Sequence, residues 1–103
     1  MEFIVVYVTA KEEEAVKIAT SLVGKKLAAC CNIIKDVRSI YSWDGALQDD
    51  HESFLVIKAR KEAFPALEAE VKRLHSYDTP EIIALPIVAG SDAYLKWAGS
   101  VTA

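Results

Sequence analysis

The feature that most constrains this chain is a long extended stretch from Leu27 to Trp43. These 17 residues would span roughly 56 Å if straight, at about 3.3 Å per residue. A compact domain of 103 residues is only about 30–35 Å across. Asp44 and Gly45 follow the stretch and give a strong signal for a tight turn. We therefore expect a β-hairpin that bends, breaks or projects beyond the rest of the domain.

One strand and one helix are predicted before this stretch. Phe3–Val8 is continuously apolar and rich in β-branched residues, which is typical of a central strand covered on both faces. Thr9, followed three residues later by Glu12, has the pattern of a helix capping box. Apolar residues then recur at helical spacing as far as Leu22, and Gly24 is expected to end the helix.

A second strand and helix are predicted after the turn. A polar connection, Gln48–Glu52, leads into a strand at Phe54–Ile57. Apolar residues at helical spacing predict a helix that starts near Phe64 and ends near His75. Another strand is expected over Ile82–Val88, and Ser91 caps a short last helix.

This order of elements predicts an α+β fold of the ferredoxin-like split βαβ type, with a single domain over residues 1–103. The elements run β-α-β-β-α-β plus a C-terminal helix, and right-handed crossovers place the first and third strands at the centre. Pro86 agrees with an edge position for the fourth strand, because proline cannot donate to a neighbouring strand. The polar pair Lys35-Asp36 interrupts the second strand, either as a β-bulge or as a true break.

Composition excludes several classes of protein. The net charge is −3, with 12 basic and 15 acidic residues, so a nucleic-acid partner is disfavoured. No apolar run reaches the roughly 20 residues of a membrane helix, so no membrane partner is expected. The N-terminal Met-Glu does not resemble a signal peptide. Cys30 and Cys31 are adjacent and cannot easily form a bridge, which favours a reducing, cytoplasmic location.

A projecting hairpin would leave open strand edges and apolar side chains in water. Tyr41 and Trp43 lie near its tip, and Trp97 is expected to cover the sheet or a neighbouring chain. Such surfaces promote aggregation unless another chain covers them. The simplest partner is a second copy of the same chain in a closed ring. We therefore expect an obligate homo-oligomer with Tyr41, Trp43 and Trp97 at the interface.

Several segments, taken in order, resemble the CutA divalent-cation-tolerance family. The matching segments are Leu27–Ile33, Ser39–Gly45, Glu52 with Ile57-Lys58, His75–Asp78, Pro80–Ile87 and Tyr94–Trp97. The resemblance implies a ferredoxin-like fold, a tight trimer held by long hairpins, and an architecture similar to PII signalling proteins. It also implies a link to copper and other divalent metals.

The chain departs from the family pattern at two positions. The family usually reads His-Pro-Tyr-Glu where this chain has His75-Ser76-Tyr77-Asp78, so Ser76 replaces a rigid residue. Some members also carry a cysteine at the end of the first strand, where this chain has Val8. A copper site copied from those members therefore lacks a soft ligand here.

The predicted metal ligands are His75, supported by Asp78, Glu81 and Cys30. An imidazole beside carboxylates suits Cu(II), Zn(II) or Ni(II), with copper bound most tightly. Alternatively, His75 completes a helix end, attracted by the helix dipole. The two cysteines cannot both face one ion from a strand, so Cys30 alone, the one that the family shares, is the candidate, unless both thiols are only packing.

Three functions follow from these features. The first is a non-enzymatic, trimeric divalent-metal or copper protein. The second is a PII-like signalling module that binds a small anionic ligand between subunits, and the third is a trimeric scaffold. An enzyme is the weakest interpretation, because the chain contains no GxSxG, P-loop, HExxH or GxGxxG motif.

Overall fold

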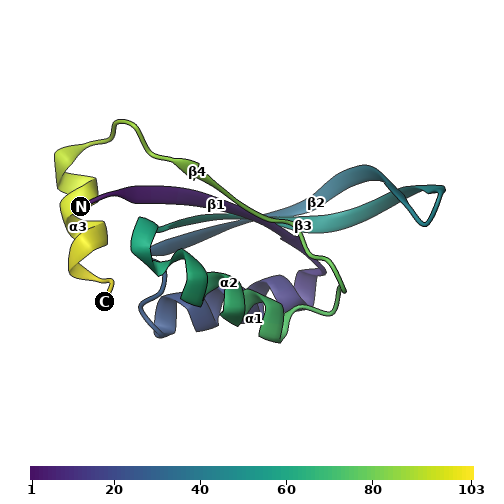
Figure 1. Ribbon diagram of the computed structural model, residues 1–103, viewed down its shortest axis with the longest axis horizontal. Coiled ribbons are helices and arrows are strands. Elements are labelled where there is room, and N and C mark those ends of the chain that lie inside the picture. Colours follow the sequence, from purple (N-terminus) through teal and green to yellow (C-terminus); the bar gives the residue numbers. More distant parts are fainter.

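A computed structural model describes residues 1–103 as one four-stranded antiparallel sheet with helices (Figure 1). The strand order is β2-β3-β1-β4, which places the first and third strands at the centre and confirms the predicted split βαβ order. The elements in chain order are β1 (Phe3–Ala10), α1 (Glu12–Gly24), β2 (Cys30–Trp43), β3 (Ala46–Arg60), the 3-10 turn η1 (Lys61–Ala63), α2 (Phe64–Leu74), β4 (Ile82–Pro86) and α3 (Asp92–Ser100).

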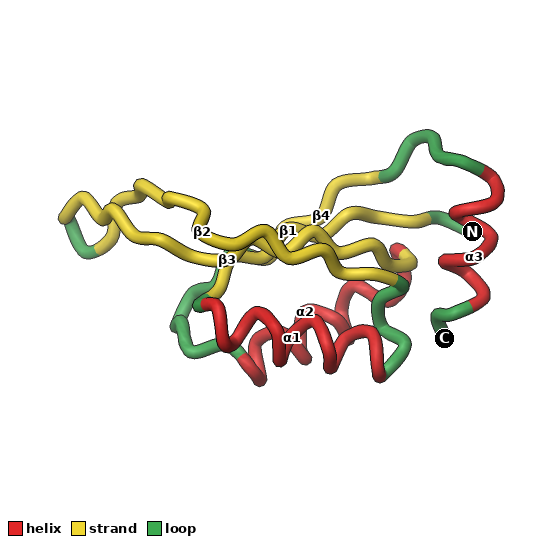
Figure 2. The backbone as a smooth tube through the Cα atoms, turned by 180° about the vertical axis from the view of Figure 1, so that it is seen from behind, coloured by secondary structure: helices red, strands yellow, loops and turns green.

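The core lies between the sheet and the helix pair α1 and α2, which cover one face of the sheet (Figures 1 and 2). Alternate residues of the central strands face this layer, and four fully buried examples are Val6, Val8, Leu55 and Ile57. The helices supply Ile18, Leu22, Leu67 and Val71, also fully buried. Helix α3 packs separately, with Ala98 against Phe3 and Ala29 at the end of the sheet where the chain begins.

The hairpin projects beyond this body, which is one of the three alternatives that the length of the extended stretch left open (Figure 2). Strand β3 pairs with β1 only through Ser53–Arg60, whereas Ala46–Glu52 pairs with Val37–Trp43 of β2 alone. We call these two outer segments the hairpin arm. The molecule measures 44 × 25 × 22 Å, and its radius of gyration is 14.1 Å, against about 13 Å for a compact chain of this length.

Two short irregularities shape the arm. The pairing register shifts between Ile34 and Val37, and Asp36 adopts a φ of 59°. The Lys35-Asp36 pair is therefore a β-bulge and not a break, one of the two alternatives left open by the sequence. At the tip, Asp44 and Gly45 have φ values of 51° and 74°, which fits the two-residue turn that their sequence predicts.

The ends of α1 differ from the prediction. Thr9 belongs to β1 and pairs with Phe54, so it cannot cap the helix; Lys11 occupies the cap position without a side-chain hydrogen bond. Sheet pairing has overridden the local capping signal here. At the other end, Gly24 is still helical, and the left-handed residue is Lys26, with a φ of 61°.

The limits of the strands also differ. The polar run Gln48–Glu52 is part of β3 and not a connection, because it pairs with β2 in the hairpin arm. Strand β2 begins at Cys30, three residues later than expected, and β4 ends at Pro86 instead of Val88. Pro86 pairs with Ile4 at the edge of the sheet, as predicted.

Candidate functional site

The main polar depression is a groove of about 1000 Å³ between the hairpin arm and the loop that follows α2. We call it the hairpin groove. Strand β1 and its end contribute Thr9 and Lys11, and the loop contributes Ser76 to Glu81. The arm contributes Ser39, Ile40, Tyr41, Trp43, Asp50, His51 and Glu52. Most of these residues are polar or aromatic, so the groove is suited to a charged ligand.

His75 fixes the loop of this groove against the sheet. It follows the last residue of α2 with extended backbone angles, and its side chain is fully buried. Its Nε2–H donates to the carbonyl oxygen of Thr9 at 2.7 Å, and its Nδ1 accepts from the backbone N–H of Tyr77 at 3.2 Å. Both ring nitrogens are therefore occupied, and neither has a lone pair free for a metal in this conformation.

Asp78 and Glu81 are the two predicted ligands that do reach the groove. Both are exposed on its loop, and neither makes a hydrogen bond or an ion pair within the chain. Carboxylates in this state are free to bind an external cation. Both residues follow the buried His75 in the chain, so the change of backbone direction at His75 determines the position of their carboxylates.

Cys30 lies in another part of the sheet. It pairs with Lys58, and Lys58 pairs with Val5, whereas His75 contacts Thr9, four residues further along β1. That offset is about 13 Å along the strand. No three His, Cys, Asp or Glu side chains lie close enough to hold a metal ion together. One chain therefore does not bring the four predicted ligands together.

The two cysteines face opposite sides of the sheet, as their adjacent positions predicted. Cys31 packs against the core, and burial raises the pKa of its thiol to about 11. Cys30 lies near the side-chain oxygen of Asn32, at 3.9 Å. Neither cysteine forms a disulfide.

Two tyrosine–carboxylate pairs in the groove were missed by the sequence analysis. The Tyr77 hydroxyl donates to Glu52 at 3.0 Å, and the Tyr41 hydroxyl donates to Asp50 at 2.7 Å. Burial, followed by the Glu52 bond, raises the pKa of Tyr77 well above its ordinary range. The bond to Asp50 likewise raises the pKa of Tyr41. Treating Gln48–Glu52 as a strand would have placed both carboxylates on one side of the arm.

Ser76 attaches the loop of the groove to α1. Its backbone N–H and its hydroxyl both donate to Glu14 of α1, at 3.2 and 3.0 Å. Burial opposes the charge on Glu14, but the two Ser76 hydrogen bonds prevail and lower the pKa of the carboxyl. The loop is thus held to α1 by two hydrogen bonds from one residue.

The charges of the groove favour a positively charged ligand. Four carboxylates line it, from Asp50, Glu52, Asp78 and Glu81, against one lysine, Lys11. The only histidine of the lining, His51, is engaged with Asp36 outside the groove at 2.7 Å. Clefts that carry charge of one sign concentrate ions of the other.

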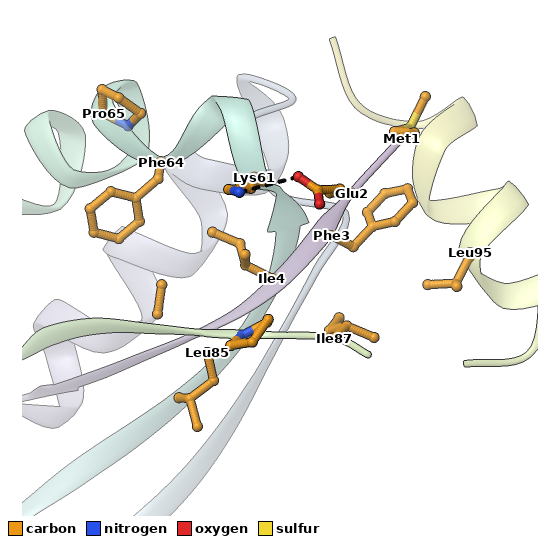
Figure 3. Close-up of a pocket in the computed structure, with 12 residues that line it drawn as sticks. Met1, Glu2, Phe3, Ile4, Lys61, Phe64, Pro65, Leu85, Ile87 and Leu95 are labelled. Atoms are coloured by element: carbon orange, nitrogen blue, oxygen red, sulfur yellow. Dashed lines mark ion pairs between the residues drawn. The ribbon is translucent and has the colours of Figure 1, made fainter. Parts of the chain in front are cut away.

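A second depression, of about 700 Å³, lies between β4, α3 and the start of α2 (Figure 3). Its lining is mostly apolar, with Phe64, Leu85 and Leu95 around it, and Lys61 pairs with Glu2 at its rim at 3.2 Å.

The predicted interface residues Tyr41, Trp43 and Trp97 are all partly exposed, and Trp97 contacts Tyr94 with ring centroids 5.5 Å apart. None of the helices has the length and apolar character needed to cross a membrane.

The sequence matches a family model described as CutA1 divalent ion tolerance protein over residues 4–101. A chloroplastic protein of Arabidopsis thaliana named CutA is 50% identical over 95 residues, which cover 91% of this chain and 52% of that protein. The chain therefore spans only about half the length of that relative.

Solved structures agree with this match. CutA1 from Oryza sativa is 44% identical in sequence, with a TM-score of 0.97 over 100% of this chain and 95% of that one. A protein from Archaeoglobus fulgidus, described as a periplasmic divalent cation tolerance protein CutA, is 40% identical, with a TM-score of 0.93 over 96% of this chain and 97% of that one. The four-stranded antiparallel sheet with three helices is thus shared with both.

Proposed function

The chain belongs to the CutA1 divalent ion tolerance family, and from this premise we propose that it is a non-enzymatic homotrimer that binds a divalent cation where its chains meet. Copper is the ion expected to bind most tightly among the common divalent metals. The observation that carries this proposal is the hairpin groove, whose four carboxylates face a single lysine. One wall of that groove is the hairpin arm, which has apolar side chains without cover.

The arm supports the assembly part of the proposal. Ile40, Trp43 and Leu47 are exposed on it, and Leu47 is 79% accessible. Beyond the end of β1, both edges of the arm also lack a strand partner. Apolar surface and open edges in one place are typical of an interface between copies of a chain. A closed trimer would cover the arm. It would also cover the exposed side chains of Trp97 and Tyr94 at the end of the sheet.

The position of the metal follows from which ligands are free. One chain offers two unpaired carboxylates, Asp78 and Glu81, which is too few to hold a divalent ion. Residues of a neighbouring chain would complete the coordination, and Cys30 would contribute only as a ligand from such a neighbour. His75 acts as a positioning residue, because its ring nitrogens hold the loop that carries Asp78.

The charges of the groove argue against the PII-like alternative. A small anionic ligand would have to approach four carboxylates with one lysine in reach. The cytoplasmic location stays a prediction, because the similar proteins named above include a chloroplastic and a periplasmic one.

Sedimentation velocity at low micromolar concentration tests the assembly. Three chains of 11.3 kDa give a particle of about 34 kDa, and a well-behaved single chain would overturn the trimer. Calorimetry with Cu(II) tests the metal site on the wild type and on the double variant Asp78→Asn/Glu81→Gln. We expect the double variant to lose most of the Cu(II) affinity, and equal affinity would exclude the two carboxylates as ligands.

The matched control is the double variant Glu62→Gln/Glu68→Gln, which removes the same charge from positions outside the groove. It is expected to bind Cu(II) as the wild type does. A loss of affinity in this control as large as in the groove variant would mean that the metal responds only to the overall charge of the chain.

A further inference from the structure

The hydrogen bonds of His75 require its imidazole to be neutral. The side chain is fully enclosed, and its Nε2–H group donates to the Thr9 carbonyl oxygen at 2.7 Å. Nδ1 accepts from the backbone N–H of Tyr77 at 3.2 Å, so this nitrogen must keep its lone pair. A proton on Nδ1 would set two N–H donors against each other. Protonation of His75 therefore breaks the bond to Tyr77.

Glu14 of α1 offers the protonated ring another acceptor. Its Oε1 lies 3.9 Å from Nδ1, just beyond hydrogen-bond distance. The same oxygen accepts from the backbone N–H and the hydroxyl of Ser76, at 3.2 and 3.0 Å. A bond between an imidazolium and a carboxylate is charge-assisted and stronger than these neutral ones. A short movement of the Glu14 carboxylate towards Nδ1 would thus form the stronger bond and give up Ser76.

No other charged group near His75 competes with Glu14 for this role. Glu14 is the one carboxylate within ion-pair distance of the ring. Glu52 of β3 is bound by a tyrosine hydroxyl instead. Arg73, near the end of α2, is bound to a carboxylate of its own helix, and Lys11 at the cap of α1 is exposed without an ion pair. The exchange of partners at Nδ1 is therefore between Glu14 and the backbone of the loop.

The loop depends on these bonds for its place beside the sheet. Tyr77 holds it at two points, through its N–H to His75 and through its hydroxyl to Glu52 at 3.0 Å. Ser76 holds it to α1. Loss of the first and third attachments would leave the loop connected to the body mainly by one exchangeable tyrosine hydroxyl.

We propose that His75 is an acid-sensitive switch, whose protonation replaces the Tyr77 amide by Glu14 at Nδ1 and releases the loop from Ser76 to Glu81. Histidine is the side chain whose ordinary titration falls between about pH 5 and 8. The loop is docked while the ring is neutral and released when it is charged. Acid would then also move the carboxylates of the loop, a consequence for cation binding that rests on the proposed function. The switch itself belongs to the metal-free chain, so it can fail while the proposed function holds.

An NMR titration of the metal-free protein from about pH 8 to pH 5 tests the proposal. The His75 ring reports its own protonation, and the amides of Ser76 and Tyr77 report the state of the loop. We expect one shared midpoint, and the protection of the Tyr77 amide from hydrogen exchange, corrected for the intrinsic effect of pH, should fall about tenfold with the loss of its bond. Protonation of His75 without a change at these amides would overturn the proposal, as would a ring that stays neutral over the whole range.

Two variants and a matched control sharpen the test. Glu14→Gln keeps an acceptor for Ser76 but lacks the negative charge, so the shared midpoint should move to lower pH. His75→Gln should abolish the transition, and its persistence there would contradict the proposal. His51→Gln replaces the other histidine of the chain and should leave the transition unchanged; its loss in this control would assign the transition to the wrong residue. If His75→Gln does not fold, the wild type and Glu14→Gln still decide the question.

Discussion

The body of this protein and its hairpin arm place their apolar side chains in opposite ways. In the body, Val6, Leu55 and Leu67 are fully enclosed between the sheet and the two helices. In the arm, Ile40 and Leu47 face water. The same continuous strand β3 takes part in both regions, with buried alternation after Ser53 and mostly exposed residues before it.

Polar contacts differ between the two regions as well. The arm is linked across its strands by Arg38 with Asp49 at 2.7 and 2.9 Å, and by Tyr41 with Asp50. Such exposed pairs contribute little to stability, so the arm is held mainly by the backbone pairing of its two strands and by its tight turn. Strand β3 therefore contributes to the folded core at one end and offers a surface for association at the other.

The largest effect is expected from a pair of leucine truncations that compares the two regions. Leu67→Ala should lower the free energy of unfolding by about 2–5 kcal/mol, because it leaves a cavity in a fully buried site. Leu47→Ala in the arm should leave unfolding of the isolated chain within about 0.5 kcal/mol and should weaken assembly instead. Urea unfolding and sedimentation measure the two effects. Similar losses of folding stability from both variants would remove the distinction between body and arm.

A smaller effect is expected at the junction of the two regions, at His75. His75→Ala leaves the Thr9 carbonyl and the Tyr77 N–H without their partner, at a cost of about 1–3 kcal/mol. Hydrogen exchange should quicken locally, at the amide of Tyr77 and in the loop that follows. The exposed Asp78→Asn serves as the control and should leave both measurements unchanged. An unaltered exchange rate at Tyr77 would mean that His75 does not hold the loop.

Much of the body could be predicted from the sequence, because its patterns are local. Helical spacing located α1 and α2, and Asp44-Gly45 located the turn. The capping pattern at Thr9 was misleading because pairing with Phe54 claimed that residue for the sheet. The left-handed residue after α1 is Lys26, which no local rule favours over Gly24.

The arm and the site were harder to predict, because their contacts join distant parts of the chain. Gln48–Glu52 has no apolar alternation, since neither of its faces packs on a core, and it therefore did not resemble a strand. His75 is a promising metal ligand in the sequence, but its ring contacts Thr9, 66 residues away. Glu52 shows no sign in the sequence of being buried, because its hydrogen bond comes from Tyr77, 25 residues further along the chain.

The next effect is the loss of folding stability at low pH, and it compares a carboxylate of the body, Glu70, with one of the arm, Asp49. Hydrogen bonds from Arg73, Ser21 and Lys25 hold the pKa of Glu70 far below its ordinary value, and Arg38 lowers that of Asp49. A lowered pKa in the folded state gives stability that is complete above the unfolded pKa, near 4.5 for Glu70 and 3.8 for Asp49. That stability is lost as the pH falls through the folded value.

Unfolding followed by circular dichroism between about pH 6 and pH 2 checks this comparison. Glu70 joins α1 to α2 and is only 8% exposed, so Glu70→Gln should flatten the fall in stability on acidification more than Asp49→Asn does. The difference between Glu70→Gln and the wild type should shrink as the pH falls below about 4.5, where the unfolded carboxylate takes up a proton while the folded one stays charged. A steeper acid loss in Glu70→Gln would contradict the assignment of Glu70 as a stabilising anion.

The smallest effect is expected where the loop of the groove meets α1. Ser76→Ala removes the hydroxyl that donates to Glu14 but keeps the backbone N–H that donates to the same oxygen. The loss should be about 0.5 kcal/mol, and the pKa of Glu14 should rise towards its ordinary value, which carbon-detected NMR titration can follow. Ser100→Ala removes a hydroxyl bonded only to the Trp97 carbonyl and should leave the pKa of Glu14 unchanged. If Ser76→Ala also leaves that pKa unchanged, the backbone N–H alone holds the carboxylate, and the loop is attached to the body through its main chain.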